Sequence, residues 1–245
     1  AFIRIYKQLD VITTSTKTAA DLIRNLGLKN PIIPISCGVD LNRFNPKNNG
    51  DYLKKRYKIP ALTPVILFVG RLDKEKHIDT LLIAFSKIPS YAGAKLVITG
   101  VGKERSNLIN LAKRLGIYKD VIFTGFVHNK DLPFLYKMAD MFVIASIAEL
   151  QSIATMEAIA SGLPILATNV MALPELISHG KNGFLFDEGD TDTLANQILK
   201  LIQNPKLLKT MSKNGLAIIK KHDLNNTVKR YEDIYREVCN IPKQF

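Results

Sequence analysis

Residues 141–164, MFVIASIAELQSIATMEAIASGLP, contain the pattern that decides the fold. The run Met141–Ala145 is apolar throughout, and a polar loop separates it from a helical stretch that stops at Gly162. Strands that are apolar at every position are typical of a parallel sheet with helices on both faces. The segment therefore predicts one strand, loop and helix of such a sheet.

The same unit recurs on both sides of this segment. We predict further strands at Val65–Val69, Leu96–Thr99, Val121–Thr124, Pro164–Thr168 and Phe184–Phe186, and helices at about 78–88, 104–116, 131–139, 152–161, 191–203, 205–221 and 224–239. This alternation predicts an α/β fold with a doubly wound, Rossmann-like parallel sheet. Because such sheets bind ligands at the carboxyl ends of their strands, candidate site residues are those that follow each strand.

The first thirty residues fit this domain less well. Leu9–Ser15 predicts a strand that leads into a Ser- or Thr-capped helix to about Leu26, and Asn30–Pro34 predicts an extended linker. One strand and one helix cannot bury each other. We therefore expect residues 1–30 to be the remnant of a preceding domain, with Ala1 in place of Met, and residues 31–245 to form the main domain.

The composition excludes several classes of protein. Of the 245 residues 47% are hydrophobic and 23% charged, and the mean hydropathy is +0.05, which excludes a disordered chain, while only 14 Gly exclude a collagen-like one. No apolar run approaches the roughly 18 residues of a membrane span, and the first residues lack the apolar stretch of a signal peptide. Cys37 and Cys239 indicate neither a disulfide framework nor a zinc site. We expect a soluble protein of the reducing cytoplasm.

The net charge of +12 lies at the ends of the sequence. Residues 1–60 hold 11 Lys and Arg against 4 Asp and Glu, residues 206–245 hold 9 against 4, and residues 61–205 hold 14 against 14. Since the predicted sheet region is neutral, the charge argues against a nucleic-acid partner. We expect the basic ends to contact a missing domain or an anionic membrane surface, which low-salt vesicle binding would test.

The first candidate site follows the strand Val65–Val69. Gly70 permits a tight turn, and Arg71 and Lys76 both reach from this loop toward one crevice. A guanidinium and an ammonium together neutralise a diphosphate without a metal ion. The alternative is a solvated loop in which these cations pair with Asp73 and Glu75.

Two further loops carry candidate residues. Gly100 and Gly102 follow a strand and allow close approach of a ligand, although a simple turn is the favoured interpretation of these residues alone. Ser152 is a plausible N-cap for a helix whose N-terminus would attract phosphate. Glu149 and Glu157 flank that cap, and the two carboxylates could grip hydroxyls at the two ends of one ligand, such as a sugar. Alternatively, Glu149 is solvated and Glu157 pairs with a cation or caps a helix.

The combination of these motifs resembles glycosyltransferase family 4, a family of retaining enzymes with the GT-B fold that use nucleotide-diphosphate sugars. The motifs cover most of the chain: Ser36-Cys37-Gly38-Val39-Asp40 with Phe44, Gly70-Arg71-Leu72 with Lys76, Gly100-Val101-Gly102, Gly125-Phe126-Val127, the Glu149 and Glu157 pair with the segment to Pro164, Pro174-Glu175-Leu176, and Asn182-Gly183-Phe184-Leu185-Phe186. The resemblance is to the second, donor-binding domain alone, so it implies that an acceptor-binding domain is missing and that the last helices cross back to it.

The resemblance also implies roles for individual residues. Arg71 and Lys76 would bind the diphosphate, Glu157 the ribose hydroxyls and Glu149 the sugar hydroxyls. The backbone of Gln151, Ser152 and Ile153 would meet the sugar and phosphate, with Gly70 and Gly100 also at the donor, and the base would lie near Gly102, Phe126 and Val127. The sequence departs from the family pattern at His77, Cys37 and Gln151-Ser152, where Gly, Asn, and an aromatic followed by Gly are common.

The expected activity is transfer of a sugar from a UDP- or GDP-linked donor to a lipid, glycan or other acceptor, with retention of configuration and without a metal or other cofactor. The acceptor would attack the face that the nucleotide leaves, and the departing phosphate would take its proton. Two alternatives stay open: a domain that binds the donor but is inactive without its partner domain, and a sugar-nucleotide epimerase of related fold.

Overall fold

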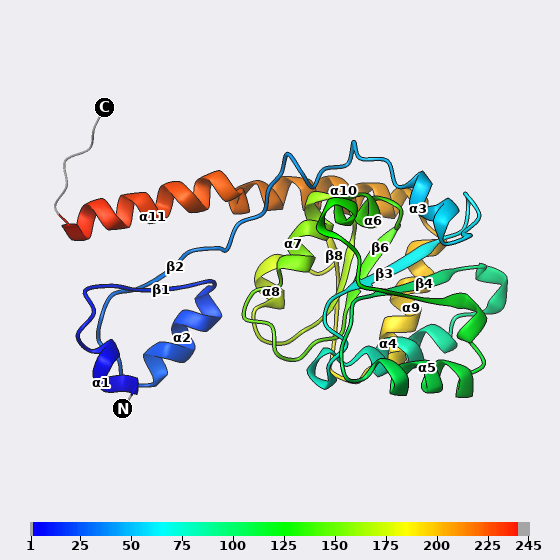
Figure 1. Ribbon diagram of the computed structural model, residues 1–245, viewed down its shortest axis with the longest axis horizontal. Coiled ribbons are helices and arrows are strands. Elements are labelled where there is room, and N and C mark those ends of the chain that lie inside the picture. The colour runs from blue at the N-terminus through cyan, green and yellow to red at the C-terminus, as the bar shows by residue number, and fades with distance from the viewer. Residues whose placement is uncertain (1, 240–245) are drawn as a thin grey trace.

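A six-stranded, all-parallel sheet forms the centre of the main domain in the computed structural model, which describes residues 2–239 (Figure 1). Its strand order is β5-β4-β3-β6-β7-β8. The strands are β3 (Val65–Val69), β4 (Lys95–Thr99), β5 (Val121–Gly125), β6 (Met141–Ile144), β7 (Ile165–Thr168) and β8 (Gly183–Phe186). All six predicted strands are present, and each predicted end differs by no more than one residue. The prediction of a doubly wound parallel sheet is confirmed.

Helices cover both faces of this sheet (Figure 1). On one face α4 (Ile78–Ser86) packs against α5 (Arg105–Arg114) and α9 (Thr191–Ile202). On the other face α7 (Ile153–Ala160) packs against α6 (Leu132–Lys137) and against α10 (Pro205–Ile219), which also contacts α9. Two apolar cores fill the space between sheet and helices, one on each side. Burial on both faces is the reason why the strands are continuous apolar runs.

Several short elements of the main domain were not predicted. They are the helices α3 (Asp51–Arg56) and α8 (Leu173–Leu176), and single 3₁₀ turns at Lys74–Lys76, Ser90–Ala92, Tyr118–Asp120, Asn129–Asp131 and Lys220–His222. Each is too short to show a helical apolar period, which needs about 11 residues to be recognised.

The N-terminal residues form a small separate unit. It contains α1 (Phe2–Tyr6), β1 (Ile12–Thr14), α2 (Lys17–Asn25) and β2 (Ile32–Pro34), and the strands β1 and β2 pair in parallel. Residues 32–34 were expected to lie in a linker. They are extended as expected, but they form a strand because their backbone groups find partners in β1. Among the residues whose burial is described, Ile12, Ala20, Leu28 and Ile32 form a small apolar core in this unit.

Several contacts join this unit to the main domain. The Glu175 carboxylate of α8 accepts hydrogen bonds from the Lys17 and Thr18 amides, at 3.1 and 2.8 Å, and from the Thr18 hydroxyl at 2.6 Å. Burial alone would raise the pKa of Glu175, but these hydrogen bonds outweigh it and lower the pKa. The last helix, α11 (Leu224–Cys239), returns from the main domain and runs beside the unit (Figure 1).

Within residues 2–239, no helix combines the length and the apolar character that crossing a bilayer requires.

Close backbone packing at the carboxyl edge of the sheet gives a test of this architecture. Gly100 has φ +135°, and a Cβ there would lie 1.8 Å from the Gly70 carbonyl oxygen. Gly100→Ala should therefore lower the free energy of unfolding by more than about 3 kcal/mol. Gly116→Ala, at φ +74° with open space around it, should cost only about 1–2 kcal/mol. Urea denaturation of both variants checks this, and equal losses would contradict the observed packing.

Candidate functional site

The strand order creates a crevice between β3 and β6. From β3 the chain continues to β4 on one side, and from β6 it continues to β7 on the other side. The loops that leave the carboxyl ends of these two neighbouring strands therefore diverge. The first loop carries Arg71 and Lys76, and the second carries Glu149 and Ser152. Strand order thus brings together two loops about 75 residues apart in the sequence.

A hollow of about 150 Å³ lies between these loops. Its lining contains six of the predicted site residues: Gly70, Arg71, Lys76, Glu149, Ser152 and Ile153. Phe68, Val69, Ile144 and Ala154 complete it. Cations from one loop and a carboxylate from the other therefore share one hollow, as predicted.

Lys76 and Glu149 form an ion pair across the crevice. The Lys76 Nζ lies 2.6 Å from Glu149 Oε1, and the two side chains are 16% and 11% exposed. The Glu75 carbonyl oxygen accepts hydrogen bonds from the Ile147 amide and the Ser146 hydroxyl, both at 3.2 Å, and so ties the two loops together. The alternative that Glu149 is solvated is wrong.

Arg71 lies at the rim of the same hollow. Its guanidinium is 69% exposed and contacts Asp73 Oδ2 at 2.5 Å and Glu75 Oε1 at 2.9 Å. The pairing that was the alternative interpretation of this loop is therefore present, while Arg71 still lines the hollow. Because these pairs are exposed, each contributes at most about 1 kcal/mol and can be exchanged for another anion.

The N-terminus of α7 faces the hollow with Ser152 and Ile153. Ser152 is the N-cap, as predicted, and its hydroxyl accepts from the Thr155 amide at 3.2 Å. The helix stops at Gly162, also as predicted, which has φ +87°. The remaining first-turn amides and the helix dipole make this end of α7 favourable for an anion.

Glu157 lies outside this hollow, one turn further along α7. Its Oε2 accepts a hydrogen bond of 2.8 Å from the hydroxyl of Tyr136 in α6. Burial raises the pKa of Glu157, and the Tyr136 hydrogen bond and the nearby Arg43 charge only partly offset this rise. The two carboxylates Glu149 and Glu157 thus occupy different surroundings. Tyr136 was missed because an aromatic residue in a short amphipathic helix is indistinguishable from ordinary core.

The other predicted residues surround the crevice without lining the hollow. Gly102 packs against the Leu72 backbone, as Gly100 does against Gly70. Phe126 is 67% exposed, with its ring against His128, and Val127 packs on the core that includes Tyr136. These residues lie in the loops after β4 and β5, beside the loop after β3.

Gln151 makes a different contact from the one predicted for its backbone. Its Oε1 accepts from the Cys37 amide at 2.6 Å, and its Nε2 lies 3.2 Å from the Ser36 hydroxyl. The Nδ1 of His222 lies 2.8 Å from the same hydroxyl. A polar chain therefore joins the loop after β6, the segment after β2 and the segment before α11.

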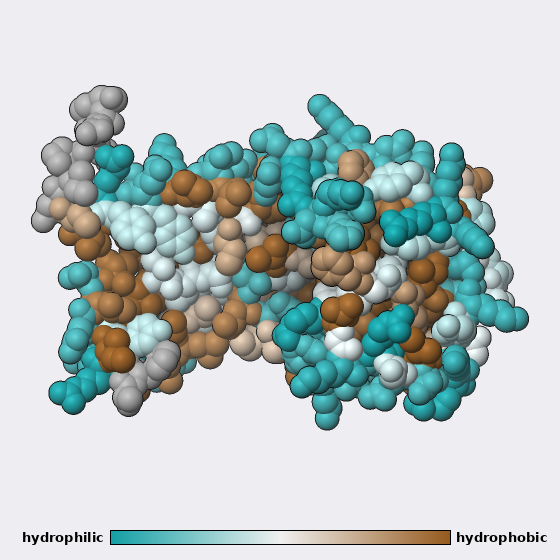
Figure 2. Space-filling model, viewed as in Figure 1, coloured by the Kyte–Doolittle hydropathy of each residue, from teal (hydrophilic) through white to brown (hydrophobic). Residues whose placement is uncertain are grey.

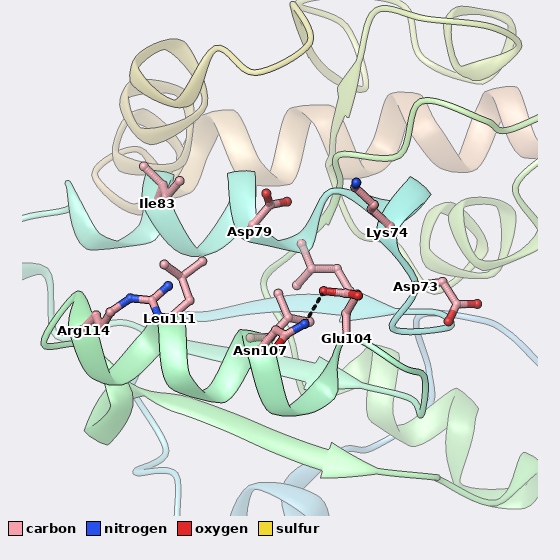
Figure 3. A pocket seen from close by; sticks show the side chains of 10 residues that line it. Asp73, Lys74, Asp79, Ile83, Glu104, Asn107, Leu111 and Arg114 are labelled. Carbon is pink, nitrogen blue, oxygen red and sulfur yellow. Dashed lines mark hydrogen bonds between the residues drawn. The ribbon is translucent and has the colours of Figure 1, made fainter.

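A larger hollow of about 360 Å³ lies between α4 and α5 (Figure 3). Asp79 and Ile83 on α4 approach it from one side, and Asn107, Leu111 and Arg114 on α5 from the other (Figure 3). It contains none of the predicted site residues, and its charges are of mixed sign. We place the candidate site at the smaller hollow because cations and a helix N-terminus converge there.

Within residues 2–239, no three or more His, Cys, Asp and Glu side chains are grouped so as to hold a metal ion.

Fold and crevice together define a doubly wound α/β ligand-binding domain. Within this class, the family described as glycosyl transferases group 1 matches residues 51–217, which is more than half of the chain. The chain belongs to this family, as its motifs predict.

Relatives and solved structures extend the match. N-acetyl-alpha-D-glucosaminyl L-malate synthase of Bacillus anthracis is 29% identical over 238 residues, covering 97% of this chain and 62% of the relative. Mannosylfructose-phosphate synthase of Agrobacterium fabrum is 31% identical over 222 residues, covering 86% and 49%. Sucrose-phosphate synthase from Thermosynechococcus elongatus has a TM-score of 0.89 at 24% identity, covering 98% and 61%. The Anabaena protein HepE in complex with UDP-glucose has a TM-score of 0.88 at 22% identity, covering 96% and 66%.

The chain therefore spans about half to two thirds of the length of these proteins. Its sheet corresponds to half of their architecture, which confirms the predicted match to the C-terminal half of a GT-B fold.

His222, a member of the polar chain at Gln151, predicts that the stability of the fold depends on pH. The pKa of His222 is lowered to about 4, mainly by burial and in part by the charge of Lys221, while the charge of Glu175 opposes this. Because the unfolded imidazole has a pKa near 6.5, the unfolded state takes up the proton first, and stability falls as the pH drops from about 6.5 toward 4.

Melting temperatures between pH 7.5 and 5 test this prediction. His222→Asn keeps a donor toward Ser36 but does not titrate, so its melting temperature should fall less steeply with acid than that of the wild type. The two curves would run parallel if His222 did not contribute.

Proposed function

We propose that this chain is the donor-binding half of a retaining glycosyltransferase that moves a sugar from a nucleotide-diphosphate sugar to an acceptor. The observation that carries the proposal is the convergence of Lys76, Arg71 and the N-terminus of α7 on one hollow at the switch point. Family membership supplies the reaction class. The isolated chain would bind the donor, and the acceptor would require a second domain.

In this proposal the diphosphate takes the place of the carboxylates that now neutralise the cations. Lys76 is paired with Glu149, and Arg71 with Asp73 and Glu75. A diphosphate in the hollow offers both cations stronger, charge-assisted contacts. Once Lys76 turns to phosphate, the Glu149 carboxylate becomes free to accept hydrogen bonds from sugar hydroxyls, which is the role that the resemblance implies for it.

Further residues extend the proposed donor site beyond the hollow. Glu157 would bind the ribose, and the base would lie near Gly102, Phe126 and Val127. The backbone of Gln151, Ser152 and Ile153 would border the sugar and phosphate, beside Gly70 and Gly100. The exposed ring of Phe126 supports this placement, because an apolar surface next to the crevice suits a flat base.

Catalysis in the complete enzyme would be electrostatic. As the bond to the sugar breaks, the diphosphate gains negative charge, and Arg71, Lys76 and the α7 dipole stabilise that charge. The acceptor would attack the face that the diphosphate leaves, and the departing phosphate would take its proton, which gives retention. The relatives' names differ in sugar and in acceptor, so they point to no single substrate for this chain.

The N-terminal unit would belong to the acceptor-binding domain. The sequence boundary would assign residues 1–30 to its remnant and residues 31–245 to the donor domain, with α11 crossing back, and β2 (Ile32–Pro34) pairs with the remnant across that boundary. The unit exposes apolar side chains at Ile5 and Leu26, 63% and 60% exposed, and Figure 2 shows apolar surface over this unit and along α11. Exposed apolar area of this kind suits contact with a further domain.

The proposal also includes a cytoplasmic location and contact of the basic ends with a membrane surface. Cys37 and Cys239 are both free, which suits the reducing cytoplasm. The exposed lysines of α10, at 206, 209 and 213, suit contact with an anionic membrane surface at low ionic strength.

Donor binding can be tested on the chain itself. In a panel of nucleotide sugars, the matching donor should raise the melting temperature of the chain, because a ligand that binds the folded state stabilises it. Lys76→Ala should then weaken donor binding, measured by calorimetry, by about 1.5–3 kcal/mol, since a charge-assisted contact is lost. Lys74→Ala is the matched control, because Lys74 is exposed and lines the other hollow. Equal affinity of both variants would place the donor elsewhere.

Turnover separates the proposal from its alternatives. A two-domain protein that joins this chain to a complementary acceptor domain should transfer the sugar, whereas the chain alone should bind the donor without transfer. Donor binding by both without any transfer would favour a binding-only domain, and release of free sugar or an epimer without acceptor would favour an epimerase.

A further inference from the structure

The hydroxyl of Tyr136 is a buried polar group whose observed hydrogen bond is to Glu157. Tyr136 is 0% exposed, and its hydroxyl lies 2.8 Å from Glu157 Oε2. Burial raises the pKa of Tyr136 well above its usual range, and the charge of Glu157 adds to this rise, so the hydroxyl stays protonated and donates. A buried tyrosine hydroxyl needs a hydrogen-bond partner. A water molecule or a backbone carbonyl oxygen would serve this need as well as a carboxylate on an apolar helix.

Packing fixes the position of this hydroxyl. The Tyr136 ring meets Phe44 edge to face, with centroids 5.8 Å apart, and Phe142 at 6.0 Å. Both neighbours are themselves buried, at 3% and 0% exposure. The ring cannot follow a movement of Glu157, so the hydroxyl acts as a fixed point to which one carboxylate oxygen is held.

The carboxylate is held next to the donor hollow and remains reachable. Ile153 and Ala154, one helical turn before Glu157 and on the same face of α7, both line the hollow. Glu157 is only partly buried, and the positive charge of Arg43 favours its ionised form. Arg43 in turn donates to the Asn129 carbonyl in the loop after β5, where the base is proposed to lie. The carboxylate is thus placed between the diphosphate hollow and the proposed base region.

We propose that Tyr136 is a positioning residue for ribose recognition: its hydroxyl holds Oε2 of Glu157 so that the carboxylate presents its free acceptor sites to the ribose hydroxyls. This inference rests on the proposed function and deepens it by adding a residue that never touches the ligand. Without the Tyr136 hydroxyl, the carboxylate would lose its fixed orientation and the compensation for its partial burial.

Discrimination between ribose and deoxyribose tests the inference. Dissociation constants for UDP, 2′-deoxy-UDP and 3′-deoxy-UDP are measured by calorimetry on the full chain, or for the GDP series if the wild type binds GDP instead. The wild type should bind at least one deoxy analogue more weakly than the parent nucleotide. Tyr136→Phe should reduce that preference by about three- to tenfold, through weaker binding of the parent nucleotide and unchanged binding of the analogue.

Two further variants make the result specific. Tyr52→Phe is the matched control, because the Tyr52 hydroxyl donates at 3.0 Å to Asp131, the N-cap of the helix α6 that carries Tyr136. Removal of the Tyr52 hydroxyl should leave the preference for the parent nucleotide unchanged. In a Glu157→Gln background, the effect of Tyr136→Phe on the preference should shrink, since both changes act on one interaction.

The outcomes separate the two levels of the proposal. A wild-type chain that binds neither UDP nor GDP would overturn the proposed function. Wild-type binding combined with an equal loss for parent and deoxy nucleotides in Tyr136→Phe, or no loss for either, would leave that function standing and overturn the positioning role.

A measurement on the wild type covers the case in which Tyr136→Phe does not fold. A buried, hydrogen-bonded hydroxyl proton exchanges slowly enough to be seen by proton NMR, and it is assigned through its contacts with the rings of Phe44 and Phe142. Its resonance should shift on addition of UDP but not of 2′,3′-dideoxy-UDP. The same shift with both nucleotides would contradict the inference.

Discussion

The Lys76–Glu149 ion pair is the interaction on which the site depends. It joins loops that leave β3 and β6, which are neighbours in the sheet although two strands separate them in the sequence. Desolvated charges are costly unless paired, so the pair favours a single arrangement of the two loops. In the absence of ligand it keeps an ammonium group at the floor of the crevice, next to the N-terminus of α7. An anion that enters this crevice meets positive charge that is already in place.

The site loop is anchored from outside the main domain as well. Thr16, the N-cap of α2, donates through its hydroxyl to the Leu150 carbonyl at 2.8 Å, and Gln151 contacts Cys37 and Ser36. The two segments that connect the N-terminal unit with the main domain also pair with each other. The Val39 amide donates to the His222 carbonyl, and the Leu224 amide donates to the Val39 carbonyl. The residues after Glu149 therefore lie where the N-terminal unit, the connecting segment and the returning helix meet.

The structure shows the surroundings of the residues that depart from the family pattern. His77 adopts φ +45°, a left-handed conformation in which Gly would be unstrained, so the Gly that is common in the family would fit this backbone conformation. Cys37 and Gln151 are two separate departures in the sequence but contact each other in space, because the Cys37 amide donates to the Gln151 side chain. The amide of residue 37 would donate with any side chain other than proline, so this contact depends on Gln151 and not on the cysteine.

The sequence by itself determined the strands, the longer helices and the loops that carry Arg71, Lys76, Glu149 and Ser152, because apolar runs, cap residues and glycine stops act locally. It did not determine α3, α8 or the pairing of β2 with β1, since a few residues show no period. Only the tertiary structure decided the partners within the site: Lys76 with Glu149, Tyr136 with Glu157, and Cys37 with Gln151. These pairs are 73, 21 and 114 residues apart, and they meet because strand order and helix packing, not local pattern, bring their backbones together.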